Sequence, residues 1–271
     1  MSIIKLKDLS FKRAIEAIGR RIVSIYHLGL WILPTQFSKE NKIKLRRLKD
    51  IHKGKRCFII ANGPSLNKID LTLLKDEITI GMNRIYLIEE KIGYLPNYLV
   101  VSDIPIQLKQ FSEEYGQVKT IKLYNWWARH LFANDTDINF FYQHFTCDFQ
   151  PDFTKTVGNS KSVTYVCMQL AFYMGFDEVY LIGKDHSYQI DGKAGLNVKA
   201  DGSEANHFIS GYYKPGQKWK IPNYLEEEYT YAIARKAFEK AGRMIKDATV
   251  DGKLEIFEKV DFNSLFETVN K

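Results

Sequence analysis

The sequence predicts an α/β protein with a Rossmann-like, mostly parallel sheet, helices on both faces and an additional N-terminal amphipathic helix. Two observations support this fold class. Short apolar runs of strand length alternate with stretches long enough to form helices, as they do in parallel sheets. Several of these runs end in small polar residues, which is typical of the strand ends where open parallel sheets bind ligands. The chain has 271 residues and 45% hydrophobic content, enough for a sizeable core.

The first 50 residues differ from the rest of the chain in charge. They hold twelve Lys and Arg against four Asp and Glu, a net charge of +8, whereas the whole chain carries +7. The basic charge therefore belongs to the N-terminal region, which argues against a nucleic-acid partner for the body. We predict a basic amphipathic helix and linker over residues 1–50 and a catalytic domain over residues 51–271.

Residues 9–33 are expected to form the amphipathic helix, and residues 35–54 a charged linker. The apolar side chains of the helix recur at spacings of four and three, at Phe11, Ile15, Ile18, Ile22 and Ile25. Its basic residues lie mostly away from that stripe, and Trp31 stands near its end. Such a helix suits the headgroup layer of an anionic membrane. The stripe could instead pack on the rest of the chain or on another subunit, so a homo-oligomer is also possible from the sequence.

Cysteine content and hydropathy predict the compartment. The three cysteines, Cys57, Cys147 and Cys167, are widely spaced and form no CxxC pair, so we expect neither a disulfide framework nor a zinc site. The start of the chain lacks the apolar core of a secretory signal, and the longest apolar run, residues 22–34, is shorter than the ~20 residues of a membrane span. We expect a cytoplasmic protein, peripheral on the inner face of the cell membrane.

Strands and helices follow one another from residue 56 onward. The apolar runs predicted as strands are residues 57–60, 78–82, 98–102, 118–123 and 178–182, with a final strand within 248–257. Helices are predicted at residues 160–174 and 224–246. Because ligands bind beyond the carboxyl ends of such strands, the residues that follow each strand are the candidate site.

The first strand leads into the turn Asn62-Gly63-Pro64-Ser65. Gly63 would let the backbone approach a ligand, and Pro64 fixes the turn. Ser65 could cap a following helix, whose free N–H groups favour phosphate, and Asn62 offers a donor and an acceptor to a sugar or base. The second strand leads to Asn83. An ordinary turn would use the same residue types.

The third strand leads to Ser102 and Asp103, and further candidates come later in the chain. Ser162, Val163 and Thr164 precede a predicted helix, where hydroxyl and N–H groups could bind phosphate or simply cap the helix. Gly183, Asp185 and His186 follow the strand at 178–182, and a polar loop then leads from Ser187 to His207, which suggests a lid. The candidate catalytic residues are His207, Asp185 and His186.

Neither a metal nor a cofactor is predicted. Asp135-Thr136-Asp137 has the form of the DxD metal motif of some glycosyltransferases, but its surroundings are typical of an exposed turn. The side chains of Trp126 and Trp127 could stack on sugars, although a core position suits them better.

Longer stretches of the chain resemble two known families. Residues 57–87, which contain Asn-Gly-Pro-Ser-Leu and a second strand ending in Asn, resemble the opening of the bacterial lipooligosaccharide sialyltransferases. Residues 162–188 resemble their middle helix and following strand. The same stretches, with residues 206–219 and 237–266, are more similar to the bacterial branch of a family named for the archaeal 6-hydroxymethylpterin diphosphokinase. Its bacterial members are associated with surface-polysaccharide and flagellin glycosylation.

The sialyltransferase resemblance implies a metal-independent fold that binds a CMP-sugar. By position, Asn62, Gly63 and Ser65 would contact the phosphate and ribose, and Asn83 and Asp103 the donor. Ser162, Val163 and Thr164 would stand near the cytidine. The family's catalytic base falls near Gly211 of the run 207–211, beside Tyr212, and no histidine stands there. His207 would therefore have to take that role, or another group would.

Three functions compete at this point. The first is a glycosyltransferase that moves a sugar, for example a nonulosonic acid such as sialic acid, from a CMP-linked nucleotide donor to a surface-glycan or lipid-linked acceptor at the bacterial membrane. The second is a pterin-type pyrophosphokinase that uses ATP and Mg²⁺, held by Asp103 and Asp185. The third is a scaffold that has kept the fold without catalysis.

Overall fold

The computed structural model describes residues 11–133, 135–144, 146–158, 162–188, 192–202 and 205–267. Contacts between Cα atoms divide the chain into two compact units, Met1–Ile43 and Lys44–Lys271, with the division inside a helix. The predicted domain border at residue 50 stays a prediction.

The N-terminal unit contains the predicted amphipathic helix, α1 (Phe11–Ile32), whose residues 9 and 10 lie outside the described part of the chain. Helix α2 (Gln36–Arg47) follows after one turn, and Thr35 Oγ1 accepts the Ser38 N–H at 3.2 Å at its start. The sequence predicted a charged linker in this stretch and no helix. Two of the three buried residues of α2, Ser38, Asn41 and Leu45, are polar, which hid the helical period. Among the described residues, no helix is long and apolar enough to cross a membrane.

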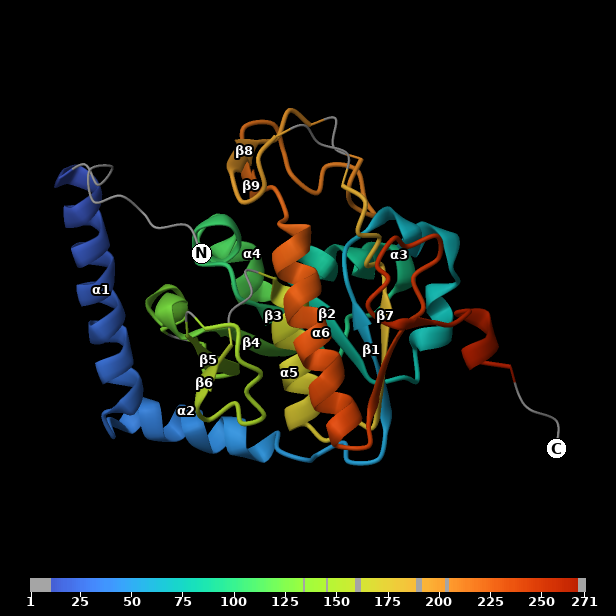
Figure 1. Cartoon of the computed structure of the whole chain (residues 1–271), viewed down its shortest axis with the longest axis horizontal. Coiled ribbons are helices and arrows are strands. Elements are labelled where there is room, and N and C mark those ends of the chain that lie inside the picture. The colour runs from blue at the N-terminus through green and yellow to red at the C-terminus, as the bar shows by residue number, and fades with distance from the viewer. Residues whose placement is uncertain are drawn as a thin grey trace. The chain divides into compact units, whose positions relative to one another are not determined.

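The second unit is built on a nine-stranded sheet in which all neighbouring strands run parallel (Figure 1). The strands in chain order are β1 (Arg56–Ile60), β2 (Thr79–Met82), β3 (Tyr98–Val101), β4 (Ile121–Asn125), β5 (Ile138–Gln143), β6 (Thr156–Val157), β7 (Glu178–Ile182), β10 (Met244–Asp247) and β11 (Glu258–Lys259). Their order in the sheet is β11-β10-β7-β1-β2-β3-β4-β5-β6. The predicted α/β class is therefore confirmed. A separate antiparallel pair joins β8 (Asn197–Lys199) to β9 (Lys218–Lys220).

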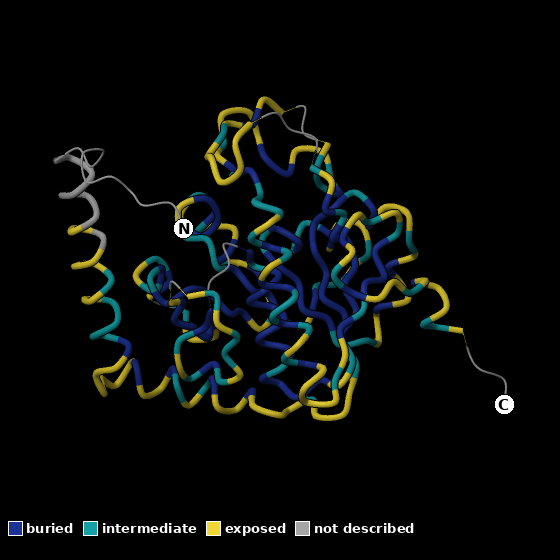
Figure 2. Tube along the Cα trace, in the orientation of Figure 1, coloured by how far each residue is buried: buried dark blue, intermediate teal, exposed yellow. Residues whose placement is uncertain are grey.

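Helices cover both faces of the sheet. On one face, α5 (Val163–Tyr173) and α6 (Tyr224–Lys240) pack in a single core with Cys57 and Ile59 of β1. On the other face, Phe58 stacks on Tyr180 at 5.4 Å and on Phe266 at 5.6 Å between ring centroids. Successive strand side chains point to opposite faces, which explains this division of β1. In Figure 2, which has the orientation of Figure 1, the chain is mostly buried where the sheet lies and largely exposed in the loops around it.

The remaining helical segments are short. They are α3 (Glu89–Ile92), α4 (Ser112–Gln117), 3₁₀ turns at Pro64–Lys68, Leu71–Leu74, Asn83–Ile88, Trp126–Phe132 and Asn263–Leu265, and a π turn at Ile104–Leu108.

The strand order creates a switch point at β1. From β1 the chain moves outward through β2, β3, β4, β5 and β6, and α5 then carries it back so that β7 pairs with the other side of β1. The connections after β1 and β7 therefore leave the sheet in opposite directions. In open parallel sheets the ligand binds in the crevice that this divergence opens.

Several elements of the structure differ from the sequence prediction. Residues 248–257 are not a strand, because the chain forms β10 earlier, at Met244–Asp247, where it pairs with β7. Helix α6 ends at Lys240, since Gly242 takes a left-handed φ of 70°. Strand β5 was not predicted, although it lies in the sheet beside β4. Its polar neighbours, residues 133–137, made the region resemble one long turn.

The packing of α6 on the sheet predicts a large loss of stability when Phe238 is truncated. Phe238 is fully buried and contacts Phe172 edge-on at 5.1 Å between centroids. Phe238→Ala should lower the free energy of unfolding by about 3–5 kcal/mol, because it leaves a cavity in the core. The measurement is urea denaturation followed by circular dichroism. The control is Leu225→Ala on the same helix, which is 81% exposed and should change little; equal losses in both variants would refute the packing described.

Candidate functional site

A cavity of about 240 Å³ lies at the carboxyl ends of β1, β2, β3 and β7. It gathers predicted site residues from segments far apart in the sequence. After β1, β2 and β3 come Asn62, Gly63, Pro64, Asn83, Ser102 and Asp103. The start of α5 and the end of β7 supply Ser162, Val163, Thr164, Gly183, Asp185 and His186. The loop beyond adds His207 and Tyr212.

Three of the residues that line this cavity each have a buried side-chain atom without a hydrogen-bond partner among the described residues. These atoms are Asn62 Oδ1, Asn83 Oδ1 and His186 Nδ1. The amide of Asn62 is held in place because its Nδ2 donates to the Met82 carbonyl at 3.1 Å. Buried polar groups nearly always have a partner, so three such residues around one cavity are typical of a place where a polar ligand binds.

The backbone at two of these residues is strained. Asn83 has φ 50° and His186 has φ 55°, in the left-handed region that residues other than glycine rarely adopt. Asn83 directly follows β2, and His186 follows β7 after three residues. Such conformations cost free energy and concentrate at functional sites, where the surrounding structure holds them.

Ser65 alone among the predicted site residues lies outside the cavity lining, although the structure describes it. It joins the turn after β1 to the turn after β7: its backbone N–H donates to Asp185 Oδ1 at 3.0 Å and its hydroxyl to Asp185 Oδ2 at 2.7 Å. Gly63 makes room for this contact, because a Cβ there would lie 1.8 Å from Asp185 Oδ2. Its φ of −73° is ordinary, so Gly63 is required by packing and not by the turn.

Acidic residues of α6 hold the residues that follow β7. Lys184 Nζ pairs with Glu227 Oε2 at 2.8 Å, and His186 Nε2 pairs with Glu228 Oε1 at 2.9 Å. Glu227 Oε2 also lies 3.6 Å from His186 Nδ1. Burial lowers the pKa of Lys184, but the charge of Glu227 outweighs it and leaves that pKa above its usual value.

His186 is neutral near pH 7. Burial lowers its pKa, the nearby Lys184 charge lowers it further, and the hydrogen bond to Glu228 opposes both only in part. When Nε2 donates to Glu228, Nδ1 is the unprotonated nitrogen. A neutral imidazole oriented by a carboxylate is the usual arrangement of a general base.

Sequence reasoning did not identify Lys184, Glu227 and Glu228. Glu227 and Glu228 lie more than 40 positions from their partners, and three successive glutamates at the start of a helix are typical of a solvated first turn. The sequence contains no local signal for these contacts.

Aromatic side chains form one wall of the cavity. The His207 ring stacks on Tyr212 at 3.8 Å between centroids, nearly parallel, and Trp219 of β9 stacks on both Tyr188 and Tyr213. The predicted lid contains β8, which pairs with β9; residues 189–191 and 203–204 lie outside the described part of it.

The end of this loop is fastened to the turn after β1. The Phe208 N–H donates to the Asn62 carbonyl at 2.9 Å, and Asn67 Nδ2 donates to the Phe208 carbonyl at 2.8 Å. The aromatic wall is therefore held against the residues that follow the first strand.

Two predicted polar residues have partners inside the protein. Asp103 Oδ1 accepts the Ile106 N–H at 2.7 Å, and its Oδ2 lies 3.4 Å from Lys220 Nζ. The Ser162 hydroxyl shares a hydrogen bond of 2.7 Å with the Tyr231 hydroxyl and does not cap α5.

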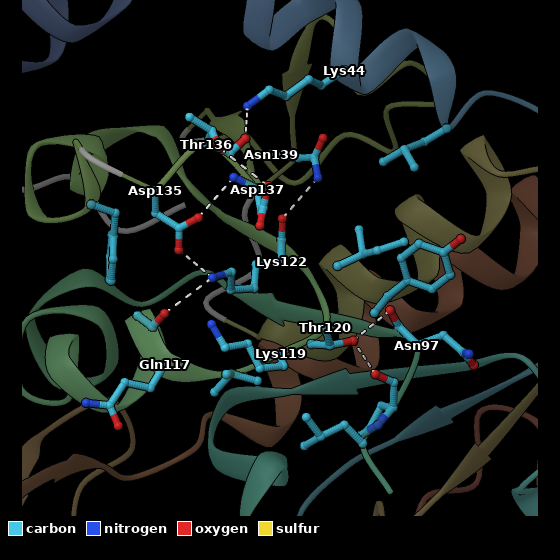
Figure 3. Close-up of a pocket in the computed structure, with 18 of the residues that line it drawn as sticks. Lys44, Asn97, Gln117, Lys119, Thr120, Lys122, Asp135, Thr136, Asp137 and Asn139 are labelled. Carbon is cyan, nitrogen blue, oxygen red and sulfur yellow. Dashed lines mark hydrogen bonds and ion pairs between the residues drawn. The ribbon is translucent and has the colours of Figure 1, made fainter.

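A second, larger cavity of about 1580 Å³ opens at the amino ends of β2, β3, β4 and β5 (Figure 3). Two of its lysines have partners within the cavity lining: Lys122 pairs with Asp135, and Lys44 donates to the Thr136 carbonyl. The predicted exposed turn at 135–137 lies here, leading into β5. Among the described residues that line this cavity, none is a predicted site residue. Ligands of parallel sheets bind at the opposite edge, so the smaller cavity is the candidate site.

The family model of the 6-hydroxymethylpterin diphosphokinase MptE-like proteins matches residues 35–191, more than half of the chain. The chain belongs to this MptE-like family. The match covers β1 to β7 and the turn that carries His186, whereas His207, Tyr212 and α6 lie beyond it. The MptE-like family is named for a diphosphokinase, which is a transferase. The predicted family is thereby confirmed; the resemblance to sialyltransferases stays a prediction.

No curated protein matches the chain.

The contact between Ser65 and Asp185 predicts a structural role for Asp185 that stability can test. Asp185→Asn replaces one of the two oxygens that accept from Ser65 by an NH₂ group, which cannot accept. One of these hydrogen bonds is then lost, so the free energy of unfolding should fall by about 1–3 kcal/mol. Thermal unfolding measures the loss. Asp251→Asn is the matched control, because that carboxylate is 72% exposed and pairs with the surface residue Lys68. An unchanged Tm for Asp185→Asn would contradict this role.

Proposed function

We propose that this MptE-like protein is a glycosyltransferase that binds a nucleotide-activated sugar, CMP-linked by the resemblance above, in the cavity at the carboxyl ends of the strands. One observation carries the proposal: Asn62, Asn83 and His186 line one cavity, and each has a buried polar side-chain atom without a partner among the described residues. They come from three different strand ends, at the switch point of the sheet. A ligand with several hydrogen-bonding groups, such as a nucleotide sugar, would satisfy all three.

The start of α5 supplies a place for the phosphate. Ser162, Val163 and Thr164 line the cavity where this 11-residue helix begins. The first N–H groups of a helix have no carbonyl partner within it, and the helix dipole adds positive potential there. A phosphate placed at this end would be stabilised as the bond to the sugar breaks, because negative charge then grows on the departing nucleotide.

His186 is our candidate for the general base. Its Nδ1 would take the proton from an acceptor hydroxyl, whose oxygen then forms a bond to the anomeric carbon as the bond from that carbon to the nucleotide phosphate breaks. The pairing of His186 Nε2 with Glu228 supports this choice, since it orients the ring. His207 remains the alternative base; its ring lies flat on Tyr212 in the cavity wall.

The name of the family favours a second function, a pyrophosphokinase that uses ATP and Mg²⁺. Its metal would need carboxylate ligands, for which Asp103 and Asp185 were the candidates. Asp185 already accepts two hydrogen bonds from Ser65, and Asp103 accepts the Ile106 N–H and pairs with Lys220. Both carboxylates would have to give up these contacts, so we rank this function second.

A nucleotide screen by thermal shift separates the two functions. CMP, UDP, GDP, CMP-sialic acid and ATP are each added with and without Mg²⁺. We expect CMP and CMP-sialic acid to raise the Tm without metal, since a ligand at 100 times its Kd stabilises the folded state by about 2.7 kcal/mol. Asn62→Ala and Asn83→Ala should reduce this shift.

Asn263→Ala, an exposed site on the C-terminal 3₁₀ turn, is the control and should keep the full shift. A shift with ATP and Mg²⁺ alone would replace our proposal by the pyrophosphokinase, and no shift with any nucleotide would favour a scaffold.

The proposed base predicts a split between binding and turnover. Glutamine in place of His186 can still donate to Glu228 but lacks Nδ1, so His186→Gln should slow release of CMP from CMP-sialic acid by about 10²–10⁴-fold while the thermal shift persists. Because the pKa of His186 is lowered, the wild-type rate should hold as pH falls through about 6.5 and decline only below it. His207→Gln is the paired variant: a loss there, with His186→Gln active, would assign the base to His207.

A further inference from the structure

Helix α1 has an apolar face that is exposed within its own unit. Five of its side chains and the residue that follows it form this face, each more than half exposed: Ile18, Ile22, Ile25, Tyr26, Ile32 and Leu33. They recur at spacings of three, four and seven, so they lie on one side of the helix. Exposed apolar patches of this kind in soluble proteins usually mark an interaction surface.

The same segment is strongly basic. The sequence of α1 holds four Lys and Arg against the single acidic residue Glu16, and that of α2 holds five against Glu40. Arg21 is exposed and lies one turn from Ile18 and Ile25, at the edge of the apolar face. From this edge a long basic side chain can reach headgroups while the isoleucines lie deeper. Tyr26 is the kind of aromatic residue found at the membrane interface.

We propose that the face of α1 formed by these six residues lies in the interfacial layer of a membrane that contains anionic phospholipids. The helix would lie along the surface, since no described helix is long and apolar enough to cross the bilayer. A helix with an apolar face, basic residues and an interfacial aromatic has the composition of surface-bound helices. Anionic headgroups also supply negative charge to a helix whose sequence has four basic residues and one acidic residue.

Charge argues against the other obvious occupant, a second copy of the chain. Two copies that met through this face would place two helices of net positive charge side by side, which is unfavourable. An anionic membrane instead has a negative surface potential, which attracts the same basic residues. The inference does not rest on the identity of the donor in the cavity, so it can fail or succeed apart from the proposed function.

Sedimentation of the full chain with lipid vesicles tests the proposal. Vesicles of phosphatidylcholine alone are compared with vesicles that also contain phosphatidylglycerol, at low and high salt. We expect binding only to the anionic vesicles, weaker at high salt. The variant Ile22→Ser/Ile25→Ser should weaken that binding by at least about tenfold, because two apolar side chains no longer enter the bilayer.

Val23→Ser is the matched control, on the same helix but off the apolar face, and it should bind as the wild type does. Circular dichroism and Tm should be the same for all three proteins, since every substituted side chain is exposed. The proposal is overturned if the wild type does not bind anionic vesicles, or if the double variant binds them as strongly as the wild type does. It is also overturned if light scattering shows a wild-type dimer that the double variant loses, which would assign the face to a second copy.

Discussion

The site depends on the parallel pairing of β1 with β7, two strands that lie about 120 residues apart in the chain. The pairing continues past the strand ends: the Ala61 N–H donates to the Ile182 carbonyl at 2.9 Å, and the Gly63 N–H to the Gly183 carbonyl at 2.8 Å. These bonds bring the two turns so close that only glycine fits at position 63, and Asp185 can then hold Ser65. Without this register, Asn62 and His186 would not line one cavity.

The sequence predicted the central strands and the edge of the sheet that carries the site, because buried parallel strands are continuous apolar runs and their polar followers must converge. The sequence did not predict elements that bury polar residues or that lie next to polar turns. Helix α2 buries Ser38 and Asn41, so its period was hidden, and β5 lies next to a polar turn. The contacts of Lys184 and His186 with α6 depend on how that helix packs on the sheet, and no local pattern records such packing.

The family match and the cavity overlap only in part. The matched residues supply the floor of the cavity, from the turn after β1 to the turn after β7. The glutamates of α6 and the aromatic wall, apart from Tyr188, come from residues beyond 191. Chemistry shared by the family would therefore reside in the floor, whereas most of the aromatic wall is built from the region outside the match. This division is consistent with one fold serving different substrates through different loops.

Asn62 has two roles that are separated by only a few atoms. Its carbonyl accepts the Phe208 N–H, which holds the aromatic loop, while its side chain belongs to the cavity lining and has a buried oxygen with no partner among the described residues. A ligand that engages the side chain would restrain the same residue on which the loop is seated. Ligand affinity and loop ordering would then be thermodynamically linked. Because linkage is reciprocal, a change that disfavours the ordered loop must lower the affinity for the ligand by the same factor.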